Sequence, residues 1–276
     1  MLALALVSIG SFFDEISIAL GKMKVEHNEE TTYSMAFLSF IWSTLWFLVI
    51  ILFKGEFVFS LASLPTLTAR IVTEIILVHI GTLAVIRSDR STYGFLRTGT
   101  IPLLLLVDFL LGYTLSLQQM FGIIILVGAL LLAFMNHGIK KEGLTLVLFA
   151  TVLPVITIAL YKYNITYFNS VEAEQLIVHI ALLTYMFIMA MRVGHENPFV
   201  LLTQRAFFVQ SFSAGIGGVL VSFAYLFAPA SMVTAAKRAI SVLWAIVSGN
   251  LYFEEKQLGL KIILFVCVSM GIILLV

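Results

Sequence analysis

Two adjacent cationic residues, Lys237 and Arg238, lie inside a long apolar stretch of the sequence. Insertion scales charge roughly 2.5–3.5 kcal/mol for Lys or Arg at the centre of a hydrophobic helix, so such residues usually face a cavity, a partner or a ligand. Lysine supplies a compact point charge, and arginine supplies a planar fork that matches carboxylate or phosphate. The doublet therefore indicates a site for an anionic ligand.

Helical periodicity extends the doublet into a polar face. At 3.6 residues per turn, the residues on that face are Thr234, Lys237, Ser241, Trp244 and Ser248. A polar face within an apolar helix is typical of a helix that lines a water-filled path. Two other interpretations stay open, because either cation can reach the lipid headgroups by snorkelling and Arg238 can pair with an acid inside the membrane.

Further charged residues interrupt other apolar stretches. Asp14 and Glu15 lie midway through the first, and Arg97 and Asp108 lie eleven residues apart in the fourth, on nearly the same helix face. A carboxylate held in apolar surroundings can retain a proton near neutral pH, so all three acids are candidates for proton coupling. Pairing of Glu15 with a cation is the simpler interpretation. Arg97 either lines a path or packs beside a helix kinked at Pro102.

These residues must be positioned by helices in a membrane. The sequence is 61% hydrophobic and only 11% charged, whereas a soluble domain carries about 25% charged residues. Ten stretches approach the roughly 20 apolar residues that a spanning helix needs. They cover residues 1–24, 33–53, 66–86, 92–111, 116–136, 143–163, 171–191, 204–226, 230–252 and 257–275. We therefore predict an all-α integral membrane protein with ten transmembrane helices.

The two halves of the sequence share weak internal symmetry. Residues at matching places are Pro65 and Pro198, Arg70 and Arg205, Arg97 and Arg238, and Gly128 and Gly271. All four separations are close to half the length of the chain, which indicates an internal repeat. We predict a first five-helix repeat at 1–137 and a second at 138–276. Because five is odd, the second repeat must be inverted across the membrane.

The stretch "ASMVTAAKRAISVLWAIVSGNLYFEEK", residues 230–256, carries a specific likeness. Together with ten short-looped spans in two halves, it resembles the drug/metabolite transporter superfamily, and the EamA-like permeases in particular. The Lys–Arg doublet is also similar to that of triose-phosphate and nucleotide-sugar translocators. The resemblance implies secondary transport along a path lined by the third, fourth, eighth and ninth spans. The fourth span departs from the EamA pattern, because Tyr113 stands where those repeats usually carry glutamate.

The leading hypothesis is a secondary active transporter that moves a small, anionic and possibly phosphorylated metabolite by alternating access. Lys237, Arg238, Ser241, Trp244, Arg97 and Thr234 are the predicted substrate-binding residues. The alternatives are proton-coupled efflux of amino acids or drug-like compounds, a membrane enzyme acting on a lipid-linked substrate, and a scaffold that transports nothing.

The sequence lacks an ATP-binding loop, a metal-binding His or Cys cluster and a nucleophile elbow. We therefore predict no enzymatic activity, no metal and no cofactor. The net charge of +1 gives no reason to expect nucleic acid. We expect the protein to work as a monomer or homodimer in a lipid bilayer, which is the cytoplasmic membrane if the source is prokaryotic.

Overall fold

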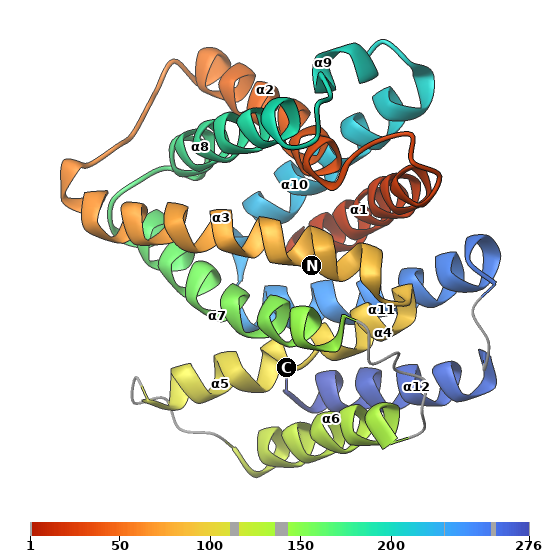
Figure 1. Cartoon of the computed structure of the whole chain (residues 1–276). Helices are drawn as coiled ribbons and strands as arrows, with labels where there is room; N and C mark the ends of the chain where they lie inside the picture. Colours follow the sequence, from red (N-terminus) through yellow and green to blue (C-terminus); the bar gives the residue numbers. More distant parts are fainter. Residues whose placement is uncertain (1, 111–115, 136–142, 229, 255–257, 276) are drawn as a thin grey trace.

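The computed structural model describes residues 2–110, 116–135, 143–228, 230–254 and 258–275, and nearly all of them are helical (Figure 1). The prediction of an all-α protein is confirmed, since this part of the chain contains no strand. The elements are α1 (Leu2–Glu26), α2 (Thr32–Lys54), the 3₁₀ turn η1 (Leu61–Ser63), α3 (Leu64–Arg87), α4 (Arg90–Arg97), α5 (Thr100–Leu110), α6 (Leu117–Met135), α7 (Leu144–Tyr167), α8 (Val171–Arg192), α9 (Pro198–Leu201), α10 (Arg205–Phe227), α11 (Ala230–Tyr252) and α12 (Leu258–Leu275).

Seven helices of the described part are long and apolar enough to cross a membrane. They are α1, α2, α3 together with η1, α7, α8, α10 and α11. The chain is therefore a multi-pass membrane protein. The apolar stretches described in α6 and α12 are shorter, at Met120–Ala129 and Leu258–Leu274. The count of ten spans and the boundary at residue 137, which lies outside the described residues, stay predictions.

The fourth predicted span is not one helix. The prediction of a continuous helix over residues 92–111 is wrong, because α4 ends at Arg97 and α5 begins at Thr100. Pro102 explains the break, since it has no N–H to offer the carbonyl of Thr98 and its ring crowds that carbonyl. The proline itself falls in the first turn of α5, where a missing N–H does no harm.

Two hydroxyl groups bridge this break to α7. Thr151 donates its hydroxyl hydrogen bond to the carbonyl of Leu96 at 3.3 Å and to that of Val147 at 2.7 Å. Thr100 donates to the carbonyl of Thr151 at 3.0 Å. These contacts hold the break against α7 in the buried interior of the bundle.

Local residues explain where the long helices begin and end. Thr31 and Ser170 cap α2 and α8, each accepting a hydrogen bond from a backbone N–H three residues later. Such caps satisfy donors that the first turn leaves free. The α2 helix ends at Gly55, whose φ of 68° favours glycine.

Glycines allow α1 and α10 to pack closely. A Cβ atom added at Gly10 would lie 2.8 Å from a methyl group of Val221, and one added at Gly217 would lie 2.8 Å from the carbonyl of Gly10. Small residues are typical of helix interfaces in membranes, because they let two backbones approach. The extensive contact between α1 and α10 therefore joins the beginning of the chain to its second half.

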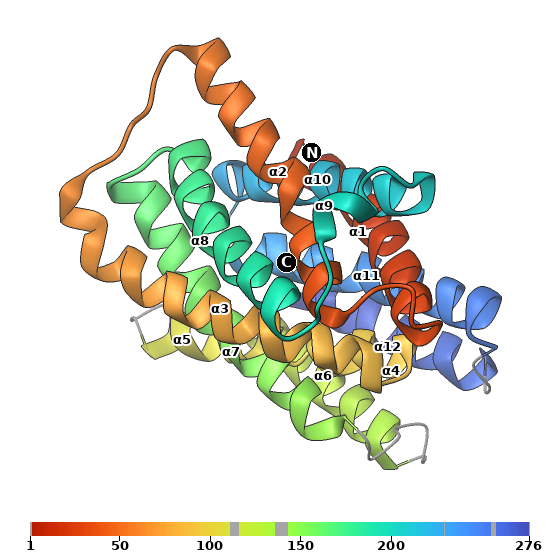
Figure 2. The same cartoon turned by 45° about the horizontal axis from the view of Figure 1, so that its top comes forward.

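The other major contacts also join distant parts of the chain. α2 packs on α8, α3 on α7, α4 on α11 and α6 on α12 (Figures 1 and 2). α2 and α8 run antiparallel, since Lys54 pairs with Glu172 at one end and Thr31 contacts Glu196 at the other, with distances of 2.9 Å in both cases. The two contacts therefore mark the two opposite ends of the helix bundle.

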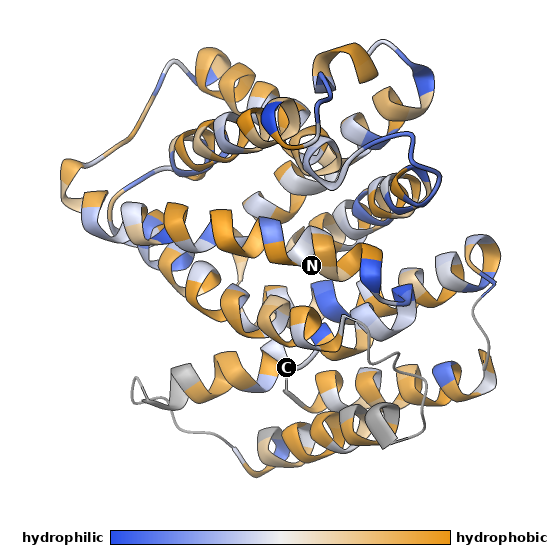
Figure 3. Cartoon of the chain, viewed as in Figure 1, coloured by the Kyte–Doolittle hydropathy of each residue, from blue (hydrophilic) through white to orange (hydrophobic). Residues whose placement is uncertain are grey.

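Apolar residues cover most of the long helices, as Figure 3 shows. Large hydrophobic side chains are exposed on the outside, including Leu52 at 72% and Phe53 at 90%. In water such a surface would be an aggregation hazard. In a bilayer it is the expected surface, because lipid is the solvent.

Candidate ligand-binding site

A cavity of about 360 Å³ lies inside the bundle, between α1, α2, α3, α4, α7, α8, α10 and α11. Its volume is within the range of pockets that bind small molecules. Its charged lining residues are Asp14, Arg70, Glu74, Arg97, Lys237 and Arg238. Four of these residues are cations and two are acids, so the cavity that the described residues enclose has an excess of positive charge.

Lys237 on α11 reaches across to Asp14 on α1. Its Nζ lies 2.9 Å from Asp14 Oδ2, and the two side chains keep 28% and 21% of their surface exposed. Both line the cavity, so the pair is accessible to what the cavity contains. A pair with this access contributes less stability than a dry one, because its partners remain partly solvated.

Arg238, the second residue of the doublet, has no carboxylate partner among the described residues. It lines the cavity and is only 5% exposed. Its Nε has no hydrogen-bond acceptor, and its charge is repelled by Arg97 and attracted at longer range by Asp14. A buried guanidinium without an anion is costly. An anion in the cavity would remove that cost.

Arg97 closes α4 and also faces the cavity. Its Nη1 donates to the hydroxyl of Tyr93 at 2.8 Å, and its guanidinium lies 5.1 Å from the centre of that ring. Its Nε is buried without an acceptor. Tyr93 positions the side chain but does not neutralise it, so Arg97 and Arg238 are two cations held by two helices around one cavity.

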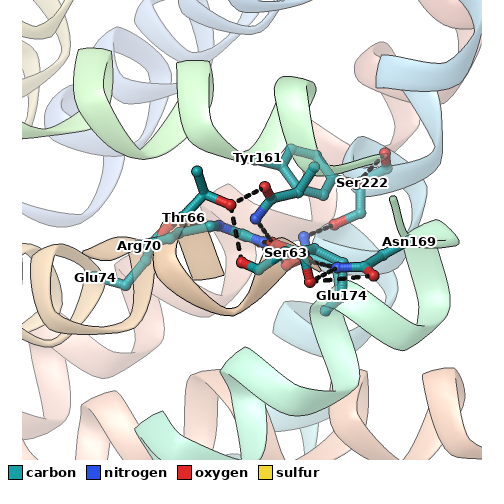
Figure 4. A network of polar contacts seen from close by, with 10 residues as sticks. Ser63, Thr66, Arg70, Glu74, Tyr161, Asn169, Glu174 and Ser222 are labelled. Atoms are coloured by element: carbon teal, nitrogen blue, oxygen red, sulfur yellow. Dashed lines mark hydrogen bonds and ion pairs between the residues drawn. The ribbon is translucent and has the colours of Figure 1, made fainter. Parts of the chain in front are cut away.

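The third cavity arginine, Arg70, is neutralised. Its Nη1 donates to Glu174 Oε1 at 2.8 Å and its Nη2 donates to Gln175 Oε1 at 2.7 Å. Arg70 is 3% exposed and Glu174 is fully buried. Figure 4 shows this contact between α3 and α8 at the centre of a polar network.

Two amides complete the coordination of Glu174. Asn164 donates to Oε1 at 2.8 Å and Asn169 donates to Oε2 at 2.6 Å. The guanidinium of Arg70 also lies 4.4 Å from the ring centre of Tyr161. Arg70 and Glu174 are therefore paired and hydrogen-bonded, as a buried ion pair requires, although Arg70 Nε has no hydrogen-bond acceptor. The network closes the cavity at the end where α7 stops and α8 starts.

The predicted polar face of residues 230–252 divides between two environments. Thr234 and Lys237 line the central cavity. Trp244 and Ser248 instead line an apolar pocket of about 310 Å³ between α1 and α11, where Trp244 packs on Phe12. Ser241 is half-buried and is absent from the linings of both spaces. The structure thus brings together Thr234, Lys237, Arg238 and Arg97 of the predicted substrate-binding residues.

The predicted proton-coupling acids have different environments. Asp14 pairs with Lys237, whereas Glu15 pairs with Arg90 at 2.6 Å and accepts a hydrogen bond from Ser248 at 2.5 Å. Glu15 is thus paired with a cation, which was the simpler of its two interpretations. The side chain of Asp108 lies outside the described residues.

Some lining residues were not found by sequence reasoning. In the sequence Arg70 and Glu174 each have a local explanation, because Glu74 follows Arg70 by one helical turn and Glu174 lies in the first turn of α8. In the structure Arg70 lies 3.9 Å from Glu74 but 2.8 Å from Glu174, so Glu174 is the closer partner. Tyr161 and Gln175 also line the cavity. Their only signal in the sequence is a polar group within an apolar segment, which does not identify a partner.

The sequence of this chain matches no protein-family model and no curated protein.

Proposed function

We propose that this protein is a secondary transporter that moves a small organic anion across the membrane by alternating access. One observation supports this function above all others. Arg97 and Arg238 line one cavity, and neither has a carboxylate partner among the described residues. Intramembrane cations without a structural partner mark substrate or ion pathways.

The chemistry of the side chains suggests the substrate class. Two guanidinium groups offer planar forks for carboxylate or phosphate oxygens, and Lys237 adds a point charge. The cavity of about 360 Å³ fits a small metabolite rather than a polymer. The proposed substrate is therefore a small metabolite that carries at least one carboxylate or phosphate group.

Asp14 gives the site a means of exchange. In the absence of substrate it neutralises Lys237, which would otherwise add a third uncompensated charge to the cavity. An incoming anion competes with Asp14 for Lys237. When the anion leaves, Asp14 pairs with Lys237 again, so release of the anion costs less free energy. Transporters need this balance, because a site that binds too tightly cannot release its cargo.

The helix contacts support the proposed inverted repeat. Adding five to the number of each predicted span converts α1 into α7, α2 into α8, α3 into α10, α4 with α5 into α11, and α6 into α12. Under this exchange the contact of α1 with α10 becomes that of α7 with α3, while the pairs α2–α8, α4–α11 and α6–α12 map onto themselves. Arg97 and Arg238 then occupy equivalent places around the cavity. The resemblance to EamA-like permeases leads to the same proposal.

A ligand-stabilisation screen tests this function. Purified protein in lipid nanodiscs is heated in the presence of phosphorylated metabolites, carboxylates, amino acids and neutral or cationic drug-like compounds. A ligand at a hundredfold excess over its Kd stabilises the folded state by about 2.7 kcal/mol. We expect stabilisation by anions only, and we expect Arg238→Gln to abolish it.

Arg192→Gln is the matched control, because it removes an exposed arginine at the end of α8. Its anion response should equal that of the unmodified protein. Stabilisation by neutral or cationic compounds alone, or anion binding that survives Arg238→Gln unchanged, would contradict the proposal. An anion found in the screen is then loaded into proteoliposomes, where counterflow of the labelled compound measures transport.

A further inference from the structure

The connection between α1 and α2 contains a buried acid that lies outside the spanning helices. Glu30 is 4% exposed and directly precedes Thr31, the cap of α2. Its Oε1 accepts a hydrogen bond of 2.9 Å from Nε2 of Gln210 on α10. The side chain of Gln210 is fully buried. This contact therefore ties the connection between the first two helices to a helix of the second half.

Each of the two side chains also carries a buried acceptor that has no donor. These atoms are Glu30 Oε2 and Gln210 Oε1. A buried polar atom without a partner costs roughly 1–3 kcal/mol. A protonated carboxyl group supplies the missing donor, because it can donate through one oxygen and accept through the other. A primary amide has the complementary pair of groups. A proton on Oε2 thus removes one bare acceptor and supplies a donor beside the side chain of Gln210, whose Oε1 lacks one.

The charges around Glu30 do not provide an ion pair for its ionised form. Lys24 on α1 pairs with Glu29 at 2.5 Å and lies over the ring of Phe207. Glu196, from the connection between α8 and α9, accepts hydrogen bonds from the N–H and hydroxyl of Thr31. The neighbouring groups are thus two acids and one cation that is paired elsewhere.

Burial raises the pKa of the Glu30 carboxyl from 4.5 to about 8. That value already includes the charges of Glu196 and Glu29, which also raise the pKa, and the hydrogen bond from Gln210 and the charge of Lys24, which lower it. The direction agrees with the geometry, since both favour the neutral acid.

We propose that Glu30 and Gln210 form a proton-binding site that fastens the α1–α2 connection to α10 when it is occupied. The site lies at the end of α2 and α8 opposite to the Arg70–Glu174 network, which is about 33 Å away along the 22 residues of α8. Release of the proton leaves a buried carboxylate beside Glu196, and the contact loosens. In a role that rests on the proposed transport function, the proton controls closure of the cavity at this end and is the coupling ion.

Thermal unfolding of the purified full-length chain tests the site without any substrate. Since the folded-state pKa of Glu30 is raised, its proton stabilises the fold fully below about pH 4.5, and this contribution is lost as the pH rises through about 8. We expect the melting temperature to fall between about pH 4.5 and about pH 8 and to level off above that, and we expect Glu30→Gln to flatten this decline. Glutamine imitates the neutral acid and retains a donor.

Glu56→Gln is the control, because it makes the same chemical change at an exposed acid beyond the other end of α2. It should keep the full pH dependence. A second variant leaves Glu30 in place: Glu196→Gln removes a neighbouring negative charge, so the midpoint of the decline should move to lower pH. A decline that Glu30→Gln leaves unchanged, or a midpoint that Glu196→Gln does not move, would overturn the proposal.

The two proposals can fail separately. If no anion binds but the pH profile depends on Glu30, the proton site stands and the transport function falls. If anions bind through Arg238 but Glu30→Gln does not change the pH dependence of the melting temperature, the transport function stands and the proton site falls.

Discussion

Asp14 and Lys237 join α1 to α11 through an ion pair of 2.9 Å that remains accessible from the central cavity. The pair connects the first helix of the chain to one near its end. The acid competes with any incoming anion for the lysine. Removing the lysine should therefore weaken anion binding, whereas removing the acid should strengthen it.

The first prediction concerns these two residues. Lys237→Ala should weaken anion binding about tenfold to a hundredfold, since hydrogen bonds to charged groups contribute about 1.5–3 kcal/mol. Asp14→Asn should strengthen it, because the lysine no longer has to leave its partner. Isothermal titration with an anion identified in the screen measures both effects. Equal weakening by the two substitutions would show that the intact pair, rather than the free lysine, binds the anion.

The second prediction separates charge from shape at Arg238. Arg238→Lys keeps the positive charge but loses the planar fork. We expect it to weaken binding of phosphate and carboxylate compounds about tenfold, which corresponds to roughly 1.4 kcal/mol. Arg97→Lys should have a similar effect, because the two arginines face the same cavity. Isothermal titration of both variants with the anion measures the change in affinity. Unchanged affinity in both variants would mean that only the positive charge, and not the planar fork, is recognised.

The third prediction concerns the network of Arg70 and Glu174. Glu174→Gln leaves a buried guanidinium without its carboxylate, which costs about 3–5 kcal/mol in comparable buried pairs. Glu172→Gln is the control, since its partner Lys54 is half exposed and such pairs contribute less than about 1 kcal/mol.

Unfolding of the two variants in the same detergent measures the difference. The double substitution Arg70→Gln with Glu174→Gln should be less damaging than the sum of its parts, because the pair is coupled. Additive losses would indicate that the two side chains do not interact energetically.

The fourth prediction concerns the packing of α1 on α10. A methyl group at Gly217 would collide with the carboxylate of Asp14 and lie 2.8 Å from the carbonyl of Gly10. Gly217→Ala should therefore separate the helices, displace Asp14 from Lys237 and lower the melting temperature. At Gly81 in α3 nothing lies within 4 Å of the added atom, so Gly81→Ala should be neutral or slightly stabilising. Equal melting temperatures for both variants would refute this account of the interface.

The sequence predicted the all-helical fold and one side of the cavity. The doublet of Lys237 and Arg238 was informative because a charge inside an apolar helix needs a reason, and periodicity placed Thr234 beside it. Periodicity identifies a helix face but not the neighbour that the face meets. For this reason Trp244 was assigned to the central cavity, although its indole packs on Phe12 in a separate pocket.

Contacts between distant helices were beyond sequence reasoning. Arg70 and Glu174 are brought together only by the packing of α3 and α7 against α8, and each had a nearer explanation within its own helix. The break in the fourth span was missed for a related reason. Its apolar composition suggested one helix, and Pro102 suggested a kink, whereas α4 already ends at Arg97, ahead of the proline.

The threonine bridge at that break restricts which residues this part of the chain can tolerate. Thr100 and Thr151 each donate a hydroxyl hydrogen bond to a backbone carbonyl of the facing segment, in the buried interior of the bundle. Valine has nearly the same shape as threonine but cannot donate a hydrogen bond, so the usual exchange of these two residues is not neutral here. Serine is the smallest change that keeps the donor, and with it the link from α4 and α5 to α7.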